Sequence, residues 1–226
     1  DVFKKSLEAH GIDFIGNSGM RYDETPENAR LLITHESMPL KDIFLPFMVL
    51  SNNAQAEALV KEMGKVVHDD GSLTSGLRVV RDVNDDLGTT RSTIRMRDGS
   101  GMSHTNYVPP NQITQLLYGV QEKSWFPTFK DRLPVAGVDD RWVAGALQNR
   151  MTEGPAQGNV TGKTGSLTTV TALSGYVTTL DGKDLIFSVM INNYMGTASD
   201  VKAIEDEIAT MLAEHEYAED VEADAS

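Results

Sequence analysis

The sequence predicts an α+β fold, in which an antiparallel β-sheet is flanked by helices and residues 40–90 form a helical subregion. Three observations lead to this prediction. Residues 161–191 contain apolar and β-branched runs separated by an Asp-Gly dipeptide, which is typical of a β-hairpin. Residues 54–63 consist of strong helix formers. Residues 201–212 place apolar side chains at helical spacing, which indicates a final amphipathic helix.

Composition restricts the classes of protein to which the chain can belong. Its 226 residues suffice for one large domain or two small ones, and a hydrophobic content of 40% supports a buried core. The net charge of -13 disfavours nucleic acid or an anionic membrane as the main partner, because both need clustered Lys and Arg. The absence of cysteine excludes a disulfide framework and thiol catalysis. The five histidines lack metal-ligand spacing, so we expect no metal and no cofactor.

The N-terminal part carries no targeting signal that the sequence reveals. No run approaches the length of a transmembrane helix, and the chain starts with neither a signal-peptide pattern nor Met. We therefore expect Asp1 to begin a processed or shortened chain, with residues upstream missing. The elements predicted in this part are a helix over 2–10 ended by Gly11, strands over 12–16 and 30–35, and turns over 17–28.

The helical subregion follows after Pro39. Residues 40–50 are apolar and end at Ser51-Asn52-Asn53, where Ser and Asn are good N-cap residues for the next helix. The elements predicted after this helix are a second helix over 73–87 that Gly88 closes, a strand over 92–97 and a tight loop over 98–103.

The second half alternates short helices with the sheet. A helix is predicted to begin at Pro109-Pro110, because proline suits the first helical turn. The remaining predicted elements are short helical pieces at 125–129 and 142–147, a loop at 151–159, the sheet and C-terminal helix within 160–213, and a solvated acidic tail at 214–226.

The first candidate site lies where the sheet begins. Lys163 and Thr164 are flanked by Gly162 and Gly165, and a strand glycine lets a ligand backbone approach closely. Together with the Ser166 hydroxyl, this pattern indicates a site for a carboxylate-bearing peptide end. Taken alone, the same residues also fit a solvated lysine before a strand, just as Ser51-Asn52-Asn53 alone fits a helix cap.

Taken together, the two motifs resemble those of a known family. A Ser-x-Asn motif at a helix junction, followed well downstream by Lys-Thr-Gly on a strand, resembles the second and third motifs of penicillin-interacting serine enzymes. Four segments are similar to the D-alanyl-D-alanine carboxypeptidase/endopeptidase family, the class C low-molecular-mass penicillin-binding proteins: 51–59, 98–103, 133–138 and 162–167. The resemblance covers nearly the whole chain in the right order.

The resemblance implies a fold, a setting and partners. It implies the serine β-lactamase/DD-peptidase transpeptidase-like fold, incomplete in this chain, with residues 1–226 as the C-terminal portion of one penicillin-binding domain. It also implies an extracytoplasmic location, in the periplasm, in the cell wall or secreted. The implied partners are peptidoglycan stem peptides ending in D-Ala-D-Ala, and β-lactams.

The resemblance also implies a role for each matched residue. A serine from the first motif attacks the D-Ala-D-Ala carbonyl and forms an acyl-enzyme. Ser51 would relay a proton to the leaving amine, and Asn53 would hold the substrate amide carbonyl. Lys163 would supply positive charge beside the relay. Thr164 and Ser166 would bind the terminal carboxylate, with the Ser166 N–H forming half of an oxyanion hole. For Asp98 and Ser100 we expect structural roles, with shaping of the cleft as the alternative.

The nucleophile motif departs from this pattern. No Ser-x-x-Lys precedes Ser51, and the one match in the chain, Ser199 to Lys202, opens the last helix, where we expect Ser199 to be an N-cap. We therefore expect the nucleophile on an N-terminal segment or another chain, so that this chain alone is inactive. The alternatives are a non-catalytic peptidoglycan- or partner-binding module that keeps the cleft and, less consistent with the flanking loops, a β-lactamase or esterase of the same superfamily.

Overall fold

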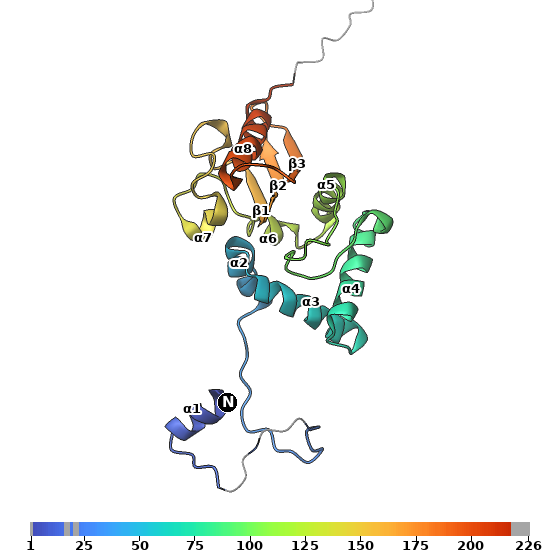
Figure 1. The fold of residues 1–226 in the computed structure, drawn as a ribbon, viewed down its shortest axis with the longest axis vertical. Helices are drawn as coiled ribbons and strands as arrows, with labels where there is room; N and C mark the ends of the chain where they lie inside the picture. Colours follow the sequence, from blue (N-terminus) through green and yellow to red (C-terminus); the bar gives the residue numbers. More distant parts are fainter. Residues whose placement is uncertain (1, 16–18, 20–22, 218–226) are drawn as a thin grey trace, which may run out of the picture. The chain divides into compact units, whose positions relative to one another are not determined.

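The computed structural model describes residues 2–15, 19 and 23–217 (Figure 1). The chain divides into one unit within residues 1–37 and another within 38–226, and each is described by itself. All of the predicted site residues belong to the second unit. In the described part of the chain, no helix combines the length and the apolar character needed to cross a membrane.

The N-terminal unit contains helix α1 (Val2–Ala9), as predicted. The strands predicted over 12–16 and 30–35 are wrong for every position that the structure describes, because residues 12–15 and 30–35 join no ladder there. A strand is stable only when its backbone groups pair with a neighbour. The apolar run at 31–33 has no such partner among the described residues and is about four-fifths exposed. Gly16 and part of the predicted turn region, 17–18 and 20–22, lie outside the described residues.

The second unit opens with three helices, α2 (Leu40–Leu50), α3 (Asn53–His68) and α4 (Leu73–Asp86), which confirms the predicted helices over 54–63 and 73–87. Glycine allows α3 and α4 to approach closely. A Cβ on Gly64 would lie 2.6 Å from the backbone nitrogen of Gly76, and a Cβ on Gly76 would overlap the Val60 carbonyl. The Ser72 hydroxyl caps α4 by accepting from the Ser75 N–H at 3.1 Å.

The middle of the chain is built of short elements. The strand predicted over 92–97 is wrong: a 3-10 turn, η1 (Arg91–Thr93), precedes a single bridge between Arg95 and Tyr107. The chain then curls into the loop 98–106, so that no second pair follows. The other elements are α5 (Pro110–Gly119), η2 (Val120–Glu122), α6 (Phe126–Lys130), α7 (Arg141–Ala144), η3 (Gly145–Leu147) and η4 (Gly154–Ala156).

The sheet is antiparallel in the order β1-β2-β3, with β1 (Thr161–Leu167), β2 (Val170–Thr178) and β3 (Asp184–Asn192). The predicted hairpin is confirmed, since Thr178 pairs with Asp184 and Gly182 adopts φ 81° in the turn between them. Glycine tolerates this left-handed backbone without the clash that a Cβ would cause. The order leaves β1, with Lys163, at one edge of the described sheet.

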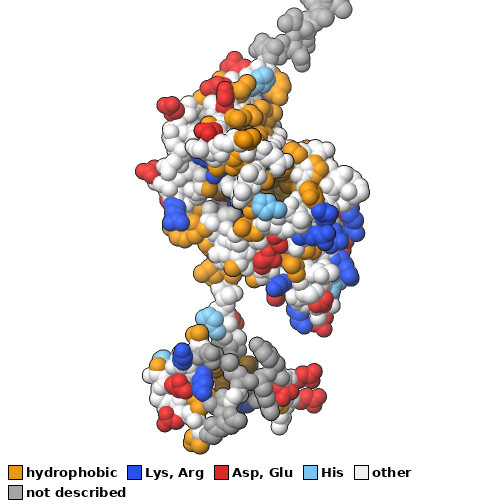
Figure 2. Space-filling view, in the orientation of Figure 1, with side chains coloured by type: hydrophobic (Ala, Val, Ile, Leu, Met, Phe, Trp, Pro, Cys, Tyr) orange, Lys and Arg blue, Asp and Glu red, His pale blue; other side chains and the backbone are white. Residues whose placement is uncertain are grey.

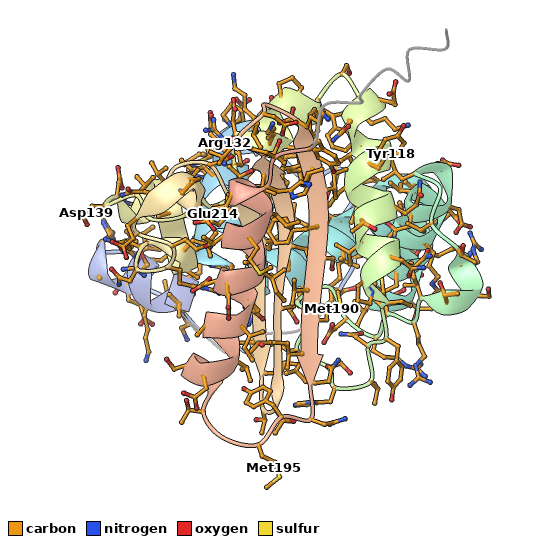
Figure 3. All side chains as sticks on the ribbon, turned by 90° about the horizontal axis from the view of Figure 1, so that it is seen from above. Tyr118, Arg132, Asp139, Met190, Met195 and Glu214 are labelled. Carbon is orange, nitrogen blue, oxygen red and sulfur yellow. The ribbon has the colours of Figure 1, made fainter. Side chains whose placement is uncertain are left out.

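Helix α8 (Ala198–Glu214) covers one face of the sheet. Figure 3 shows α8 running alongside the three strands. Small residues make this contact close: Ala209 and Ala213 are fully buried and pack in one cluster with Leu173, Val177 and Phe187. Because alanines four positions apart lie on one helix face, the helix backbone comes near the sheet. The amphipathic helix predicted from 201–212 is thereby confirmed.

Residues from α2, α5 and α6 pack on the opposite face of the sheet. Tyr176 of β2 joins Met48, Leu117 and Leu133 in a second core cluster, with Phe126 stacked edge-on at 5.8 Å between ring centroids. The Tyr176 hydroxyl donates to the Leu117 carbonyl at 2.7 Å, and burial raises the pKa of Tyr176 to about 12. Helices thus cover both faces of an antiparallel sheet, which confirms the α+β class. Residues 218–226 of the predicted acidic tail lie outside the described residues.

Candidate active site

The first predicted motif lies in the sharp junction between α2 and α3. Ser51 ends α2 in the left-handed region, with φ 54° and ψ 54°, which is unusual for a residue other than glycine. The Asn52 side chain caps α3 by accepting from the Gln55 N–H at 3.0 Å. Asn52 therefore caps α3, and the side chains of Ser51 and Asn53 are available to line the cleft beside the sheet. Strained backbone of this kind is common where function constrains a side chain.

The fold joins this junction to the second predicted motif. Lys163 of β1 donates from Nζ to the Ser51 Oγ at 2.8 Å, although the two residues are 112 positions apart. Lys163 also donates to the Thr164 carbonyl at 3.1 Å. Burial lowers the pKa of Lys163, because removing water disfavours the ammonium form. The lysine is therefore held beside the serine hydroxyl with no carboxylate paired to it within the described chain.

All six predicted site residues line one cleft of about 540 Å³. They are Ser51, Asn53, Lys163, Thr164, Gly165 and Ser166. Met102, Leu167 and Val170 add an apolar wall to the same cleft. The cleft thus combines hydroxyls, one amide and one ammonium with a surface that can receive an aliphatic group.

The edge of β1 supplies backbone donors to this cleft. The Gly162 N–H bonds the Pro134 carbonyl at 2.9 Å, across the edge of β1 that faces away from β2. Alternate N–H groups of an antiparallel strand point to the same edge. The N–H groups of Thr164 and Ser166 therefore point the same way as that of Gly162, toward the cleft side. Two such donors can stabilise negative charge on an oxygen bound there.

The two glycines that flank Lys163 and Thr164 differ in their surroundings. Only Gly165 faces open space, since a Cβ there would meet nothing closer than Ala172 at 3.8 Å. Gly162 is buried, and a Cβ on it would lie 2.6 Å from the Ser174 carbonyl. The prediction that both glycines admit a ligand is therefore wrong for Gly162, because β2 already occupies that space.

A loop tied to α3 forms another wall. One oxygen of Glu57, Oε1, accepts from the Ser100 hydroxyl at 2.7 Å, the Ser100 N–H at 3.0 Å and the Gly99 N–H at 3.1 Å. The hydrogen bond from the Ser100 side chain is the main reason that the pKa of Glu57 is lowered. Asp98 shapes the loop from inside by accepting from the Gly101 and Ser103 N–H groups. The loop thereby holds Ser100 against the cleft.

Sequence reasoning did not select Glu57. The signal was its position four residues after Asn53, which places both side chains on one face of α3. Its partner, Ser100, was expected to have a structural role or to shape the cleft, and nothing in the sequence shows that the loop 98–106 reaches α3. This contact between residues 43 positions apart is a property of the fold.

The Ser-x-x-Lys match lies away from the cleft. The predicted N-cap role of Ser199 is wrong, because Thr197 caps α8 through a reciprocal pair of hydrogen bonds with Asp200. Ser199 is exposed on the first turn of α8, and neither it nor Lys202 lines the cleft. Among the described residues, no group of three or more His, Asp or Glu could hold a metal ion.

Comparison with known proteins identifies the family to which this chain is related. The model of the D-Ala-D-Ala carboxypeptidase 3 (S13) family matches residues 1–215. The chain belongs to the S13 family. This confirms the relationship inferred from the Ser51-Asn52-Asn53 and Lys163-Thr164-Gly165 motifs.

Two S13 relatives show how much of a longer protein the chain represents. It is 37% identical to a D-alanyl-D-alanine carboxypeptidase of Actinomadura sp. (strain R39) over 95% of this chain and 39% of the relative. It is 28% identical to the D-alanyl-D-alanine carboxypeptidase DacB of Haemophilus influenzae over 86% of this chain and 40% of the relative. The chain thus spans about two fifths of the length of these S13 proteins.

A solved structure supports the same S13 fold. Penicillin binding protein 4 (dacB) from Haemophilus influenzae, complexed with a β-lactam, matches with a TM-score of 0.83 and 26% identity. The match covers 95% of this chain and 50% of that one. The expected transpeptidase-like fold is confirmed by this match.

Proposed function

We propose that this chain forms the part of a serine D-Ala-D-Ala carboxypeptidase/endopeptidase that binds the peptide end and relays the proton. The observation that carries the proposal is the 2.8 Å hydrogen bond from Lys163 to Ser51, at the edge of the cleft that Asn53 also lines. In this view residues 1–226 are the C-terminal portion of one penicillin-binding domain. The nucleophilic Ser-x-x-Lys then belongs to a segment outside these residues.

The reaction proceeds in two steps. The nucleophilic serine oxygen bonds to the carbonyl carbon of the penultimate D-Ala, the C–N bond breaks, and the terminal D-Ala leaves as an amine. The lysine of the Ser-x-x-Lys motif takes the proton of the nucleophilic serine. Ser51 passes its own proton to the leaving amine and receives the proton held by that lysine, while the Lys163 ammonium keeps the Ser51 hydroxyl oriented. Water then attacks the acyl ester, which releases the shortened peptide and restores the serine.

The remaining cleft residues orient the substrate. In this proposal Asn53 donates to an amide carbonyl of the peptide, and the hydroxyls of Thr164 and Ser166 donate to its carboxylate; all three residues line the cleft. The outward N–H of Ser166 can stabilise the oxyanion of the tetrahedral intermediate, a donor typically contributing about 3 kcal/mol. Peptidoglycan stem peptides ending in D-Ala-D-Ala, and β-lactams that acylate the same serine, are the ligands that this arrangement fits. The proposed setting is outside the cytoplasm, where such peptides occur.

A second candidate is a non-catalytic module that binds peptidoglycan or a partner through the same cleft. It is favoured by one observation, the absence of Ser-x-x-Lys from the cleft side of this chain. The two candidates share ligand recognition and differ in acylation.

Labelling with a fluorescent penicillin, followed by intact-mass analysis, separates these candidates. We expect no adduct on residues 1–226 alone and a single adduct on a serine of the Ser-x-x-Lys segment when a longer protein containing that segment is used. Lys163→Met in the longer protein should abolish labelling, whereas Lys183→Met, at an exposed lysine after β2, should leave it intact. An adduct at Ser199 would overturn the assignment of the nucleophile. No adduct on the longer protein would favour the binding module.

A further inference from the structure

Residues 71–97 reverse the sign of the charge that the rest of the chain carries. They contain five basic and three acidic residues, a net charge of +2, whereas the whole chain carries -13 and the remaining residues therefore -15. The five basic residues are all arginines: Arg78, Arg81, Arg91, Arg95 and Arg97. The proposed function gives this group of arginines no role.

Two of the three aspartates in this range are bonded to one arginine. Arg91 donates from Nη2 to Asp82 and from Nε to Asp85, which ties the segment after α4 back to that helix. Asp86 is the one aspartate of the range that forms no ion pair within the described chain. Four arginines and one carboxylate thus remain, which is a net charge of +3.

Arg78 lies on a face of α4 that α3 does not cover. Gly76 packs so closely on the Val60 carbonyl of α3 that no Cβ would fit there. Successive residues of a helix are about 100° apart, so Arg78, two positions later, points away from this contact, and it is exposed. Asp70, just before α4, accepts from the Ser72 N–H and hydroxyl. Figure 2 shows basic side chains gathered around α4.

The segment after α4 adds two exposed arginines, Arg95 and Arg97. The Arg95 guanidinium lies over the Tyr107 ring, 4.3 Å from its centroid, and Arg95 Nε donates to the Thr105 carbonyl at 3.1 Å. These contacts restrict the side chain of Arg95 before any ligand arrives, so that less conformational entropy is lost on binding.

We propose that Arg78, Arg81, Arg95 and Arg97 form a surface that binds a linear polymer of phosphodiesters outside the cytoplasm. A guanidinium donates two parallel N–H bonds to one phosphate, which suits a group made of arginine without lysine. None of the four lines any of the three cavities found in the described chain, so the ligand lies across the surface rather than in a pocket. A thin, flexible polymer can follow such a strip without approaching the acidic remainder of the protein, which a DNA duplex is too wide to do. The surface then keeps the protein beside anionic polymers of its surroundings.

The test measures binding of a fluorophore-labelled poly(glycerol phosphate) chain by fluorescence anisotropy at several salt concentrations. Each phosphate neutralised on a single strand contributes about -0.7 to the slope of log K against log salt, so four arginines should give a slope of about -3. Arg78→Gln and Arg97→Gln should each weaken binding roughly fivefold at low salt and make the slope less steep by about 0.7. Arg78→Lys should keep the slope, because the charge stays, and bind less tightly than the unchanged chain.

The control is Lys183→Gln, at an exposed lysine after β2, and it should leave binding and slope unchanged. The free energy of unfolding in urea should be the same for Arg78→Gln and the unchanged chain, so that lost binding does not report lost folding. An unchanged slope in Arg78→Gln would overturn the inference. Duplex DNA with the same number of phosphates bound as tightly as the polymer would overturn the choice of partner.

A longer protein that contains the Ser-x-x-Lys segment must also bind the polymer. Failure to bind there would show that the surface is covered, and the inference would be refuted. Penicillin labelling of that longer protein should be the same with and without Arg78→Gln. The proposed function therefore stands or falls separately from this surface.

Discussion

Replacing Glu57 with Ala should release the loop 98–106 from α3 without unfolding the unit. The change removes one carboxylate oxygen that accepts three hydrogen bonds from Gly99 and Ser100. A hydrogen bond to a charged group contributes about 1.5–3 kcal/mol, and three bonds to one partly exposed oxygen do not add, because water replaces some of them. We therefore expect a loss of about 2 kcal/mol, confined to the loop.

The assay is amide hydrogen exchange. The N–H groups of Gly99 and Ser100 donate directly to Glu57, so their protection reports on this contact alone. A loss of about 2 kcal/mol corresponds to roughly 30-fold faster exchange at these two amides. The control is Glu62→Ala, at an exposed residue of the same helix whose side chain forms no hydrogen bond within the described chain, and it should leave both amides unchanged.

A conservative variant and a pH titration separate the contribution of the Glu57 charge to stability from that of its shape. Glu57→Gln keeps an acceptor oxygen and loses charge assistance, so about 1 kcal/mol should be lost. Because the folded pKa of Glu57 lies below its ordinary value of 4.5, its charge stabilises the fold fully above that value and stops doing so as the pH falls through the folded pKa. The difference in stability between the unchanged protein and the Glu57→Gln variant should therefore shrink as the pH falls through the folded pKa of Glu57. Unchanged exchange at Gly99 and Ser100 in Glu57→Ala would refute the reasoning.

Three further predictions concern the sheet. Lys163→Met should leave the free energy of unfolding unchanged or raise it by about 1 kcal/mol in urea titrations at neutral pH, because it removes a charge that burial disfavours; a clear loss of stability would contradict this. Gly162→Ala should lower the free energy of unfolding by about 2 kcal/mol, since its Cβ would lie 2.6 Å from the Ser174 carbonyl. Gly165→Ala should leave the free energy of unfolding unchanged, because its Cβ would meet open space. Equal losses in the two variants would contradict this difference between the two glycines. With a folded pKa of about 12 and an ordinary value of 10.0, Tyr176 should make stability fall as the pH rises from 10 to 12; Tyr176→Phe should lack this part of the fall when the two proteins are titrated with urea in parallel.

Local sequence chemistry was sufficient for several elements. The helix formers of α3, the Asp-Gly turn before β3 and the helical spacing in α8 each specify a conformation within a few residues of chain. The strand predicted over 30–35 used the same kind of signal and was wrong. Its apolar and β-branched residues fit a strand, but a strand also needs a partner, and the sequence of one segment does not contain that partner.

In the candidate site too, the sequence specifies some features, and others depend on segments that are distant in the chain. The resemblance of two motifs and their flanking segments to a known family singled out Ser51, Asn53 and Lys163. The 2.8 Å contact between Lys163 and Ser51 could not be read from a sequence in which they lie 112 residues apart. Glu57 escaped notice for a related reason, since its spacing from Asn53 indicates a shared helix face but not the loop 98–106 that it contacts.

The sequence by itself thus determined the fold class, the family relationship and the residue types available for chemistry. Only the tertiary structure decided that Asn52 caps α3 while Ser51 turns toward Lys163, and that Glu57 holds the loop 98–106. The physical reason is the separation along the chain over which each kind of interaction acts. Helix, turn and strand preferences arise between neighbours in the chain, whereas burial and charge pairing depend on segments that the packing of α2, α3 and the sheet brings together.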